Sequence, residues 1–283
     1  MSRNRYTWTE EKIAKYYKEG RGSGDLANYR PWLTIQDVPS EGRAHRPRGW
    51  KTTRKHDLLS DLELSFFFYL EWSNKVIDIK EQYPLDRQDT MEIAAEKHIP
   101  HPFEKSTQTP IVMTTDFLVT IRTGKDINII ARSIKPSEKL EDPDVLGKLE
   151  IERQFWEDKG IQWTIVDEKV MPKQFFKNMR YIHEYFYLPD KKEEETAKYF
   201  LSFLDSRQPK YPEKMLIDCC NEFDSLYNLD DGSSIYYLRH LYARQYILPN
   251  DMNNKPIVPH GISLNELNLR SGGSKGSYGN SIS

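Results

Sequence analysis

Cysteine is scarce in this chain: its 283 residues include two, Cys219 and Cys220, and these are adjacent. Neighbouring cysteines rarely bond to each other, and they do not supply the C-x-x-C spacing of a structural zinc site. Their arrangement predicts a reduced, cytoplasmic protein that holds neither a disulfide nor structural zinc.

Long apolar runs are also missing. The mean hydropathy is -0.76, 37% of the residues are hydrophobic, and no segment reaches the roughly 20 apolar residues of a transmembrane helix. The N-terminus lacks the apolar core of a signal peptide. The composition therefore allows a buried core but predicts no membrane partner. The length suits one large or two ordinary domains.

Neither sign of charge dominates, because 41 Lys and Arg stand against 43 Asp and Glu. Basic residues nevertheless gather between positions 43 and 56, just before an apolar helical segment. Such a cluster suits phosphate contacts, although a solvated basic loop is the alternative. The candidate DNA-binding residues are Arg43, His45, Arg46, Lys51, Arg54 and Lys55.

Periodicity predicts an N-terminal α/β unit. Helices are expected over 9–19, 58–72 and 91–98, and a short strand over 75–80. Two strand-like runs flank a turn at Gly124, which predicts a hairpin. A helix over 144–159, closed by Gly160, then leads to a strand over 161–166. This strand–helix–strand order predicts a right-handed crossover and a parallel strand pair, and hence a mixed sheet.

Beyond Met171 the pattern becomes mainly helical. Helices are expected over 172–188, 193–206, 212–226 and 233–244, followed by a hairpin within 247–258, which together suggest a winged-helix-like domain. The segment 262–270 reads as a last strand or a partner contact. Basic residues make 233–244 a DNA-binding candidate, although its apolar content favours a core or protein-binding role. We place the domains at 1–168 and 169–270, with a disordered tail over 271–283.

The predicted hairpin brings Asp116 close to Lys135. Alternating strand side chains put Ser133 and Lys135 on one face and Ile134 on the other. A carboxylate beside a lysine on a sheet is typical of metal-dependent nucleases. Each residue also has a structural explanation, because an Asp can stabilise a turn and a strand-end lysine can extend into water.

Two glutamates strengthen the metal hypothesis, since Glu63 and Glu152 both fall on apolar helix stripes. A buried unpaired charge is costly, and a divalent cation shared with Asp116 would neutralise it. Mg²⁺ takes carboxylate, carbonyl and water oxygens, so the Ile134 carbonyl is a further candidate ligand. Glu63 has an alternative role, because Ser-Asp-Leu-Glu (60–63) fits a helix capping box. Lys135 could orient or deprotonate a water molecule, or stabilise developing charge.

Several motifs resemble the TnsA family, the endonuclease subunit of a heteromeric bacterial transposase. They are Glu-Gly-Arg-Gly (19–22), Pro-Trp-Leu-Thr (31–34), Val-Pro-Ser (38–40), Leu-Leu-Ser-Asp-Leu-Glu-Leu (58–64), Leu-Glu-Trp (70–72), Thr-Asp-Phe-Leu-Val (115–119), Lys-Pro (135–136) and Lys-Leu-Glu-Ile-Glu-Arg (148–153).

The resemblance implies a restriction-endonuclease-like N-terminal domain and a winged-helix C-terminal domain. It also implies Mg²⁺-dependent cleavage of double-stranded DNA at the 5′ ends of a transposon, with Mn²⁺ as a possible substitute. The implied partners are a TnsB-like transposase and a TnsC-like ATPase in the bacterial cytoplasm. Glu63, Asp116 and Lys135 match the family's catalytic residues.

One position departs from the family, which commonly carries Gln where this chain has Ser133. A hydroxyl is shorter than an amide, so Ser133 would reach the metal only through water. Either catalysis is weaker, or Glu152 and the Ile134 carbonyl complete the ligand set of Glu63, Asp116 and Ser133. Two alternatives stay open. The chain could be a stand-alone restriction or repair nuclease, or an inactive DNA-binding assembly factor.

Overall fold

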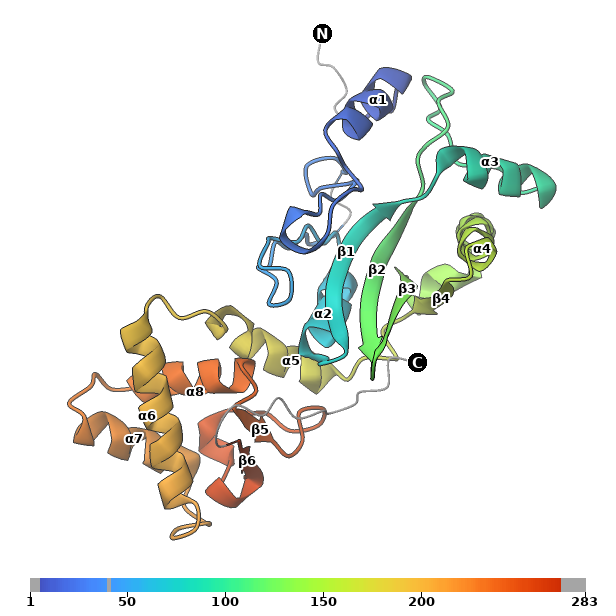
Figure 1. Cartoon of the computed structure of the whole chain (residues 1–283). Helices are drawn as coiled ribbons and strands as arrows, with labels where there is room; N and C mark the ends of the chain where they lie inside the picture. The colour runs from blue at the N-terminus through green and yellow to red at the C-terminus, as the bar shows by residue number, and fades with distance from the viewer. Residues whose placement is uncertain (1–5, 40–41, 271–283) are drawn as a thin grey trace. The chain divides into compact units, whose positions relative to one another are not determined.

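The computed structural model describes residues 6–39 and 42–270 (Figure 1). Its backbone divides into two compact units, one ending at Met171 and the other beginning at Pro172. The segment expected to form a disordered tail, 271–283, lies outside the described residues. None of the described helices is long and apolar enough to cross a membrane.

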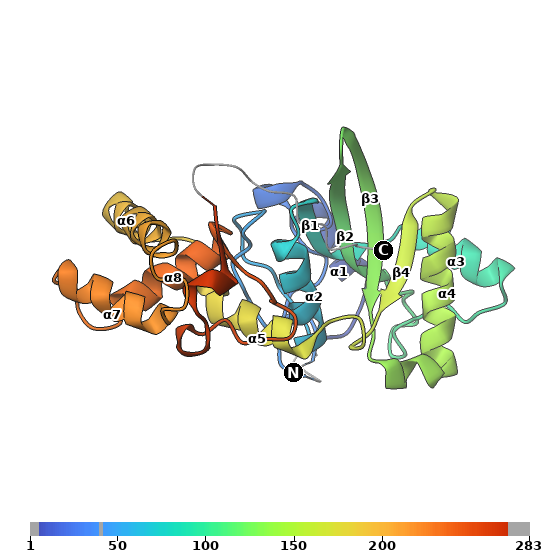
Figure 2. The ribbon, with the colours of Figure 1, turned by 90° about the horizontal axis from the view of Figure 1, so that it is seen from below.

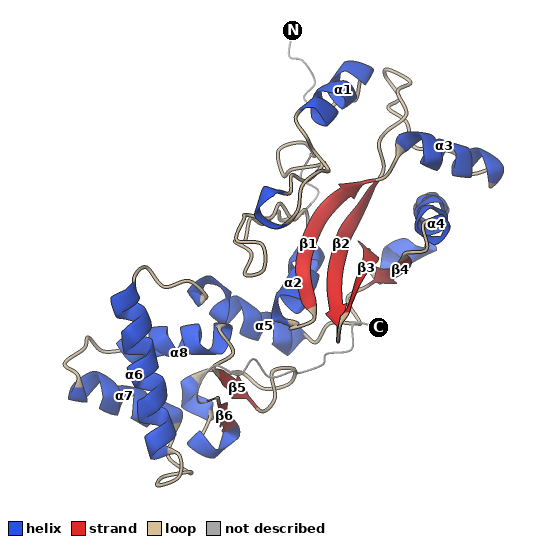
Figure 3. Cartoon of the chain, in the orientation of Figure 1, coloured by secondary structure: helices blue, strands red, loops and turns tan. Residues whose placement is uncertain are grey.

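A four-stranded mixed sheet organises the N-terminal unit (Figure 3). Its strands, in spatial order, are β1 (Val76–Pro84), β2 (Thr114–Thr123), β3 (Asp126–Ile134) and β4 (Gln162–Val166). The first three pair antiparallel, whereas β3 and β4 run parallel. The predicted hairpin and the predicted parallel pair are confirmed, and the arrangement fits a restriction-endonuclease-like fold.

The tight hairpin between β2 and β3 follows from its turn residues. Thr123 pairs with Asp126, which leaves Gly124 and Lys125 as a two-residue turn. Gly124 has a φ of +63°, a conformation that glycine adopts without a steric penalty. The turn fixes the register, so that Phe117 lies opposite Arg132 and Asp116 lies one position further along.

Helices cover both faces of this sheet, with α2 (Asp61–Trp72) on the side opposite α4 (Pro143–Asp158) (Figure 2). The Phe66 ring of α2 meets Phe117 of β2 at 5.5 Å. On the other face, Leu118 packs with Phe155 of α4 in a buried cluster. Successive strand residues point to opposite faces, so β2 contributes to both cores.

Side-chain caps set the helix boundaries. The Thr9 hydroxyl accepts a hydrogen bond from the Lys12 N–H at the start of α1 (Glu10–Lys18). Ser60 caps α2 in the same way, so this helix begins at Asp61 rather than at Leu58. Asp86 caps α3 (Arg87–Glu96), which therefore begins earlier than predicted. Gly160 has a φ of +65° after α4, as the sequence predicted. Two short 3₁₀ turns, η1 (Leu26–Asn28) and η2 (Ser137–Glu141), complete this unit.

The C-terminal unit is mainly helical, as predicted. It contains α5 (Lys173–Ile182), η3 (His183–Tyr185), α6 (Lys191–Arg207), α7 (Leu216–Leu226) and α8 (Ser233–Ala243). The Phe200 and Phe223 rings meet at 4.8 Å within its core. In α8, the His240 ring hydrogen-bonds to the Tyr185 carbonyl, and Arg239 bonds to the Tyr185 hydroxyl. These contacts favour the core role for α8 over DNA binding.

The prediction of a hairpin within 247–258 is wrong. Strand β5 (Ile247–Pro249) pairs instead with β6 (Leu267–Leu269), with Leu248 opposite Asn268. The Asn178 amide of α5 donates to the carbonyls of Met252 and Lys255, each at 2.8 Å. These bonds hold the connecting segment against α5 and prevent it from returning as a strand. The turns η4 (Pro259–Gly261) and η5 (Leu264–Glu266) follow, and the last strand expected within 262–270 is confirmed.

Candidate active site

The start of β2 and the end of β3 bring Asp116 and Lys135 together. The Oδ2 atom of Asp116 accepts hydrogen bonds from the Ile134 N–H at 2.7 Å and from the Lys135 Nζ at 2.8 Å. The same ammonium donates to the Ile134 carbonyl at 3.0 Å. Gln82 of β1 donates to the other oxygen of Asp116 at 3.4 Å. Asp116 is therefore fixed in place by three neighbours from two adjoining strands.

Glu63 lies in the first turn of α2, with 6% of its surface exposed. Its carboxylate accepts hydrogen bonds from the Leu59 N–H at 3.0 Å and from the Ser60 hydroxyl at 3.1 Å. Ser60 caps the Glu63 N–H in return. In a capping box the Glu63 carboxylate would accept from the Ser60 backbone N–H. Here it accepts from the Leu59 N–H instead, so the capping role is present in altered form. These bonds orient Glu63 without neutralising its charge.

Glu152 projects from α4 into the core, where it is 5% exposed. Its Oε1 atom accepts hydrogen bonds from the Thr115 hydroxyl at 2.7 Å and the Ser133 hydroxyl at 2.5 Å. Each hydroxyl accepts an indole N–H in turn, from Trp156 at 2.7 Å and from Trp163 at 3.0 Å. Ser133 is therefore committed to Glu152 and Trp163, which makes it a support for that carboxylate.

Sequence reasoning missed Thr115, Trp156 and Trp163. The available signal was the four-residue spacing of Glu152 and Trp156 on one helix face, because a buried indole N–H needs an acceptor. Trp163 gave no local signal, since its partner Ser133 lies 30 positions away.

The three carboxylates influence one another electrostatically. Burial and the negative charge of Asp116 raise the pKa of Glu63 to about 7. The same two causes raise the pKa of Glu152 to about 7. Burial lowers the pKa of Lys135, but the charge and hydrogen bond of Asp116 outweigh it and raise that pKa above its ordinary value. The site therefore holds more negative charge than one ammonium neutralises once both glutamates ionise.

These residues fit a hard divalent cation. Within residues 6–39 and 42–270, no three His, Cys, Asp or Glu side chains group closely enough to hold a metal by themselves. Mg²⁺ typically takes one or two carboxylates and completes its shell with water and substrate phosphate. The Lys135 ammonium already bridges Asp116 and the Ile134 carbonyl, the two oxygens that the sequence suggested as ligands. A positive charge is thus favoured at this point.

Several side chains of the basic segment 43–56 are held by contacts within the protein. Arg54 makes two bonds to the fully buried Glu81, at 2.7 and 2.5 Å, and His56 contacts the same carboxylate at 2.8 Å. Burial raises the pKa of Glu81, but His56 and Arg54 outweigh it and lower that pKa to about 2. The Arg54 side chain is 9% exposed, which argues against the expected phosphate contact and indicates a structural role.

The other candidate DNA contacts differ in accessibility. Lys51 donates to the Ser73 carbonyl at 2.9 Å, and His45 contacts Asp61 at 2.7 Å. Arg46 lies 3.2 Å from Asp57 but remains half exposed. Arg43 and Lys55 are exposed. Among the candidate DNA contacts, the accessible cations are therefore Arg43, Arg46 and Lys55.

Comparisons with known proteins agree with this geometry. Residues 73–168 match the family "TnsA-like endonuclease N terminal", and residues 171–250 match "TnsA endonuclease C terminal". The chain is 38% identical over 250 residues to the transposon Tn7 transposition protein TnsA of Escherichia coli. The aligned stretch covers 87% of this chain and 88% of that protein. This chain therefore belongs to the TnsA family of transposon endonucleases.

Proposed function

We propose that this chain hydrolyses the phosphodiester bond at the 5′ ends of a transposon, on the strand that is not transferred to the target. Family membership implies DNA as substrate, a divalent metal, and partners in transposition. The more specific assignment is Mg²⁺, with Mn²⁺ able to replace it, and a complex with a TnsB-like transposase and a TnsC-like ATPase. The contact of Lys135 with both Asp116 and the Ile134 carbonyl supports this proposal most directly.

Asp116 and Glu63 would hold the cation, together with the Ile134 carbonyl. When bound, the cation would lower the pKa of a water molecule and neutralise charge on the scissile phosphate. Glu152 is too deeply hydrogen-bonded to Thr115 and Ser133 to leave its position without breaking both bonds. Its part is therefore to add negative charge beside Asp116 or to complete the ligand set through water.

Lys135 is the chain's own cation in this site. Because its pKa is raised, it stays protonated at neutral pH and is suited to stabilise charge that develops on the phosphate. Its side chain is one-third exposed, so a substrate phosphate can reach it.

Strand-specific cleavage tests this proposal. Labelled transposon-end DNA is incubated with Mg²⁺, with and without the transposase and ATPase partners, using wild type and Asp116→Asn. We expect 5′-strand cuts that require the partners and vanish in the variant, while 3′-end joining continues and leaves products attached to donor DNA. Asp126→Asn, at the exposed turn of the same hairpin, is the matched control and should cut normally.

Two outcomes would contradict the proposal. Cutting by the purified chain without partners would favour a stand-alone nuclease. Unaltered excision with Asp116→Asn would leave an assembly role instead of a catalytic one.

A further inference from the structure

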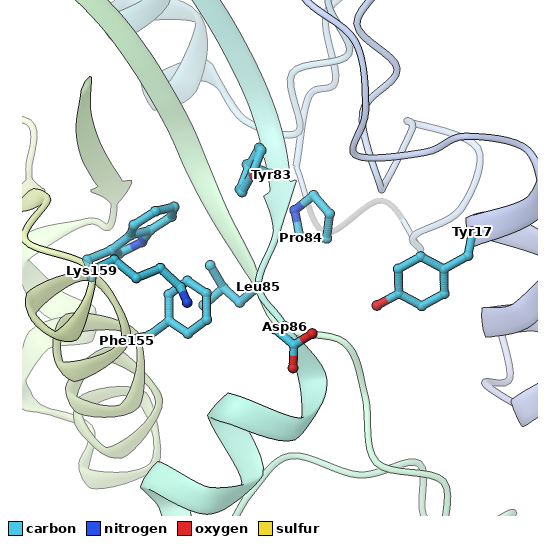
Figure 4. Close-up of a pocket in the computed structure, with 8 residues that line it drawn as sticks. Tyr17, Tyr83, Pro84, Leu85, Asp86, Phe155 and Lys159 are labelled. Atoms are coloured by element: carbon cyan, nitrogen blue, oxygen red, sulfur yellow. The ribbon is translucent and has the colours of Figure 1, made fainter. Parts of the chain in front are cut away.

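An aromatic pocket is lined by residues of α1, β1, α4 and the start of α3 (Figure 4). Its volume is about 270 Å³. Its rings come from three separate elements and its charged groups from two helix ends. Its lining includes Tyr17, Tyr83, Asp86, Phe155, Trp156 and Lys159.

Hydrogen bonds connect the pocket to the Glu152 side of the candidate active site. Tyr83 of β1 lies opposite Thr115 of β2, and Thr115 directly precedes Asp116. The Trp156 indole donates to the Thr115 hydroxyl at 2.7 Å, and that hydroxyl donates to Glu152 at 2.7 Å. The Thr115 hydroxyl therefore links Trp156, which lines the pocket, to the Glu152 carboxylate.

The mouth of the pocket combines an exposed ring with charged groups. Tyr17 of α1 is 50% exposed and lies across the pocket from Phe155 of α4 (Figure 4). The Lys159 ammonium lies 4.4 Å from the centre of the Phe155 ring and 3.0 Å from Asp89. Asp86 is exposed at the start of α3. This mouth is suited to a flat ring that carries polar atoms on its edge.

We propose that this pocket receives one unstacked nucleobase of the DNA substrate, close to the phosphodiester that is cut. The inference rests on the proposed function, which brings DNA to the candidate active site. Aromatic side chains form stacking platforms for bases of any sequence. Ligand sites usually begin near 300 Å³, so a pocket of about 270 Å³ suits a single ring system better than a whole nucleotide.

The charged groups favour a base over an apolar side chain of a protein partner. Lys159 can meet the phosphate that follows the base, and Asp86 can accept a hydrogen bond from an exocyclic amino group. An apolar side chain would gain nothing from either group and would pay their desolvation. Unstacking a base costs a few kcal/mol, which stacking on the exposed Tyr17 ring would offset.

Removal of single bases tests the proposal in the reconstituted complex. Abasic sites are placed one at a time on both sides of the cut, and cleavage is compared in wild type, Tyr17→Ala and Tyr17→Phe. We expect one position at which base loss slows wild-type cleavage about tenfold, the effect of one lost stacking contact. Tyr17→Ala should slow cleavage of intact DNA similarly and no longer respond to base loss there. Tyr17→Phe, which keeps the ring, should behave as wild type.

Tyr6→Ala removes another exposed tyrosine outside the pocket and controls for surface effects. Cleavage by Tyr17→Ala at the Tyr6→Ala rate, or an unchanged abasic profile in Tyr17→Ala, would overturn the proposal. If Tyr17→Ala loses transposase binding and its abasic profile is unchanged, the pocket binds a protein side chain. That result would also overturn the proposal.

A binding measurement separates this proposal from the proposed function. The complex is assembled with Asp116→Asn, and 2-aminopurine replaces each base near the cut in turn. Fluorescence should change at one position on binding, and this change should disappear when Tyr17→Ala is added. A signal without any wild-type cleavage would refute the nuclease assignment alone, whereas cleavage without any position-specific signal would refute the base pocket alone.

Discussion

The buried charge of Glu152 leads to a sharp prediction about stability. Replacement by Gln keeps an oxygen that can accept hydrogen bonds from Thr115 and Ser133, the bonds that Glu152 makes at 2.7 and 2.5 Å. It removes the negative charge that burial and Asp116 disfavour. We therefore expect Glu152→Gln to stabilise the N-terminal unit at alkaline pH and to reduce DNA cleavage, because functional sites often sacrifice stability.

The magnitude follows from the shifted pKa. Glu152 titrates at about 7 instead of 4.5, which corresponds to about 3 kcal/mol at about 1.4 kcal/mol per unit. Between these two pH values the native state keeps a proton that the unfolded state has released, so wild-type stability falls as pH rises. At pH 8 the full penalty is present, and at pH 4 it is absent.

The assay is urea unfolding at several pH values, followed by tryptophan fluorescence. All six tryptophans lie at or before position 163, so the signal reports on the N-terminal unit. We expect Glu152→Gln to exceed wild type by up to about 3 kcal/mol at pH 8 and to match it near pH 4. Glu150→Gln, on the same helix but more exposed, is the control.

Two results would refute this reasoning. Destabilisation by Glu152→Gln at pH 8 would mean that an ionised carboxylate is needed for folding. An unchanged pH dependence would mean that Glu152 is not the group that titrates near neutrality.

Three further predictions follow from the same contacts. Arg54→Met should destabilise the chain by about 3–5 kcal/mol, because it removes the guanidinium partner of the buried Glu81 carboxylate and leaves it only the His56 ring and the Asp57 N–H. Exposed Lys55→Met should change stability by less than about 0.5 kcal/mol and lower the salt dependence of DNA binding by about one phosphate contact. Equal unfolding midpoints for the two variants would contradict this. Asp116→Asn should lower the pKa values of Glu63 and Glu152 and so flatten the loss of stability between pH 4.5 and about 7, and an unchanged slope would count against their electrostatic coupling. Mg²⁺ should raise the Tm more at pH 8 than at pH 5, where these glutamates are protonated, and KCl of equal ionic strength should not.

Local signals foretold much of the fold. Gly124 supplies the turn of the hairpin, Ser60 and Thr9 cap their helices, and Gly160 ends α4. These features depend on backbone hydrogen bonds between near neighbours, which short sequence patterns encode. Helical periodicity also placed Glu63 and Glu152 on inward faces, and both are buried.

The sequence by itself therefore determined the elements, the hairpin that joins Asp116 to Lys135, and the family. Only the tertiary structure decided that Arg54 is buried against Glu81 and that the Ser133 hydroxyl donates to Glu152. It also decided that β5 pairs with β6 and not with a strand inside 247–258. These contacts join residues 18 to 27 positions apart, where no periodicity links the partners. A buried charge or hydroxyl that has lost its water must find a partner inside the protein. The packing of the chain determines which groups are buried and which partners lie within reach.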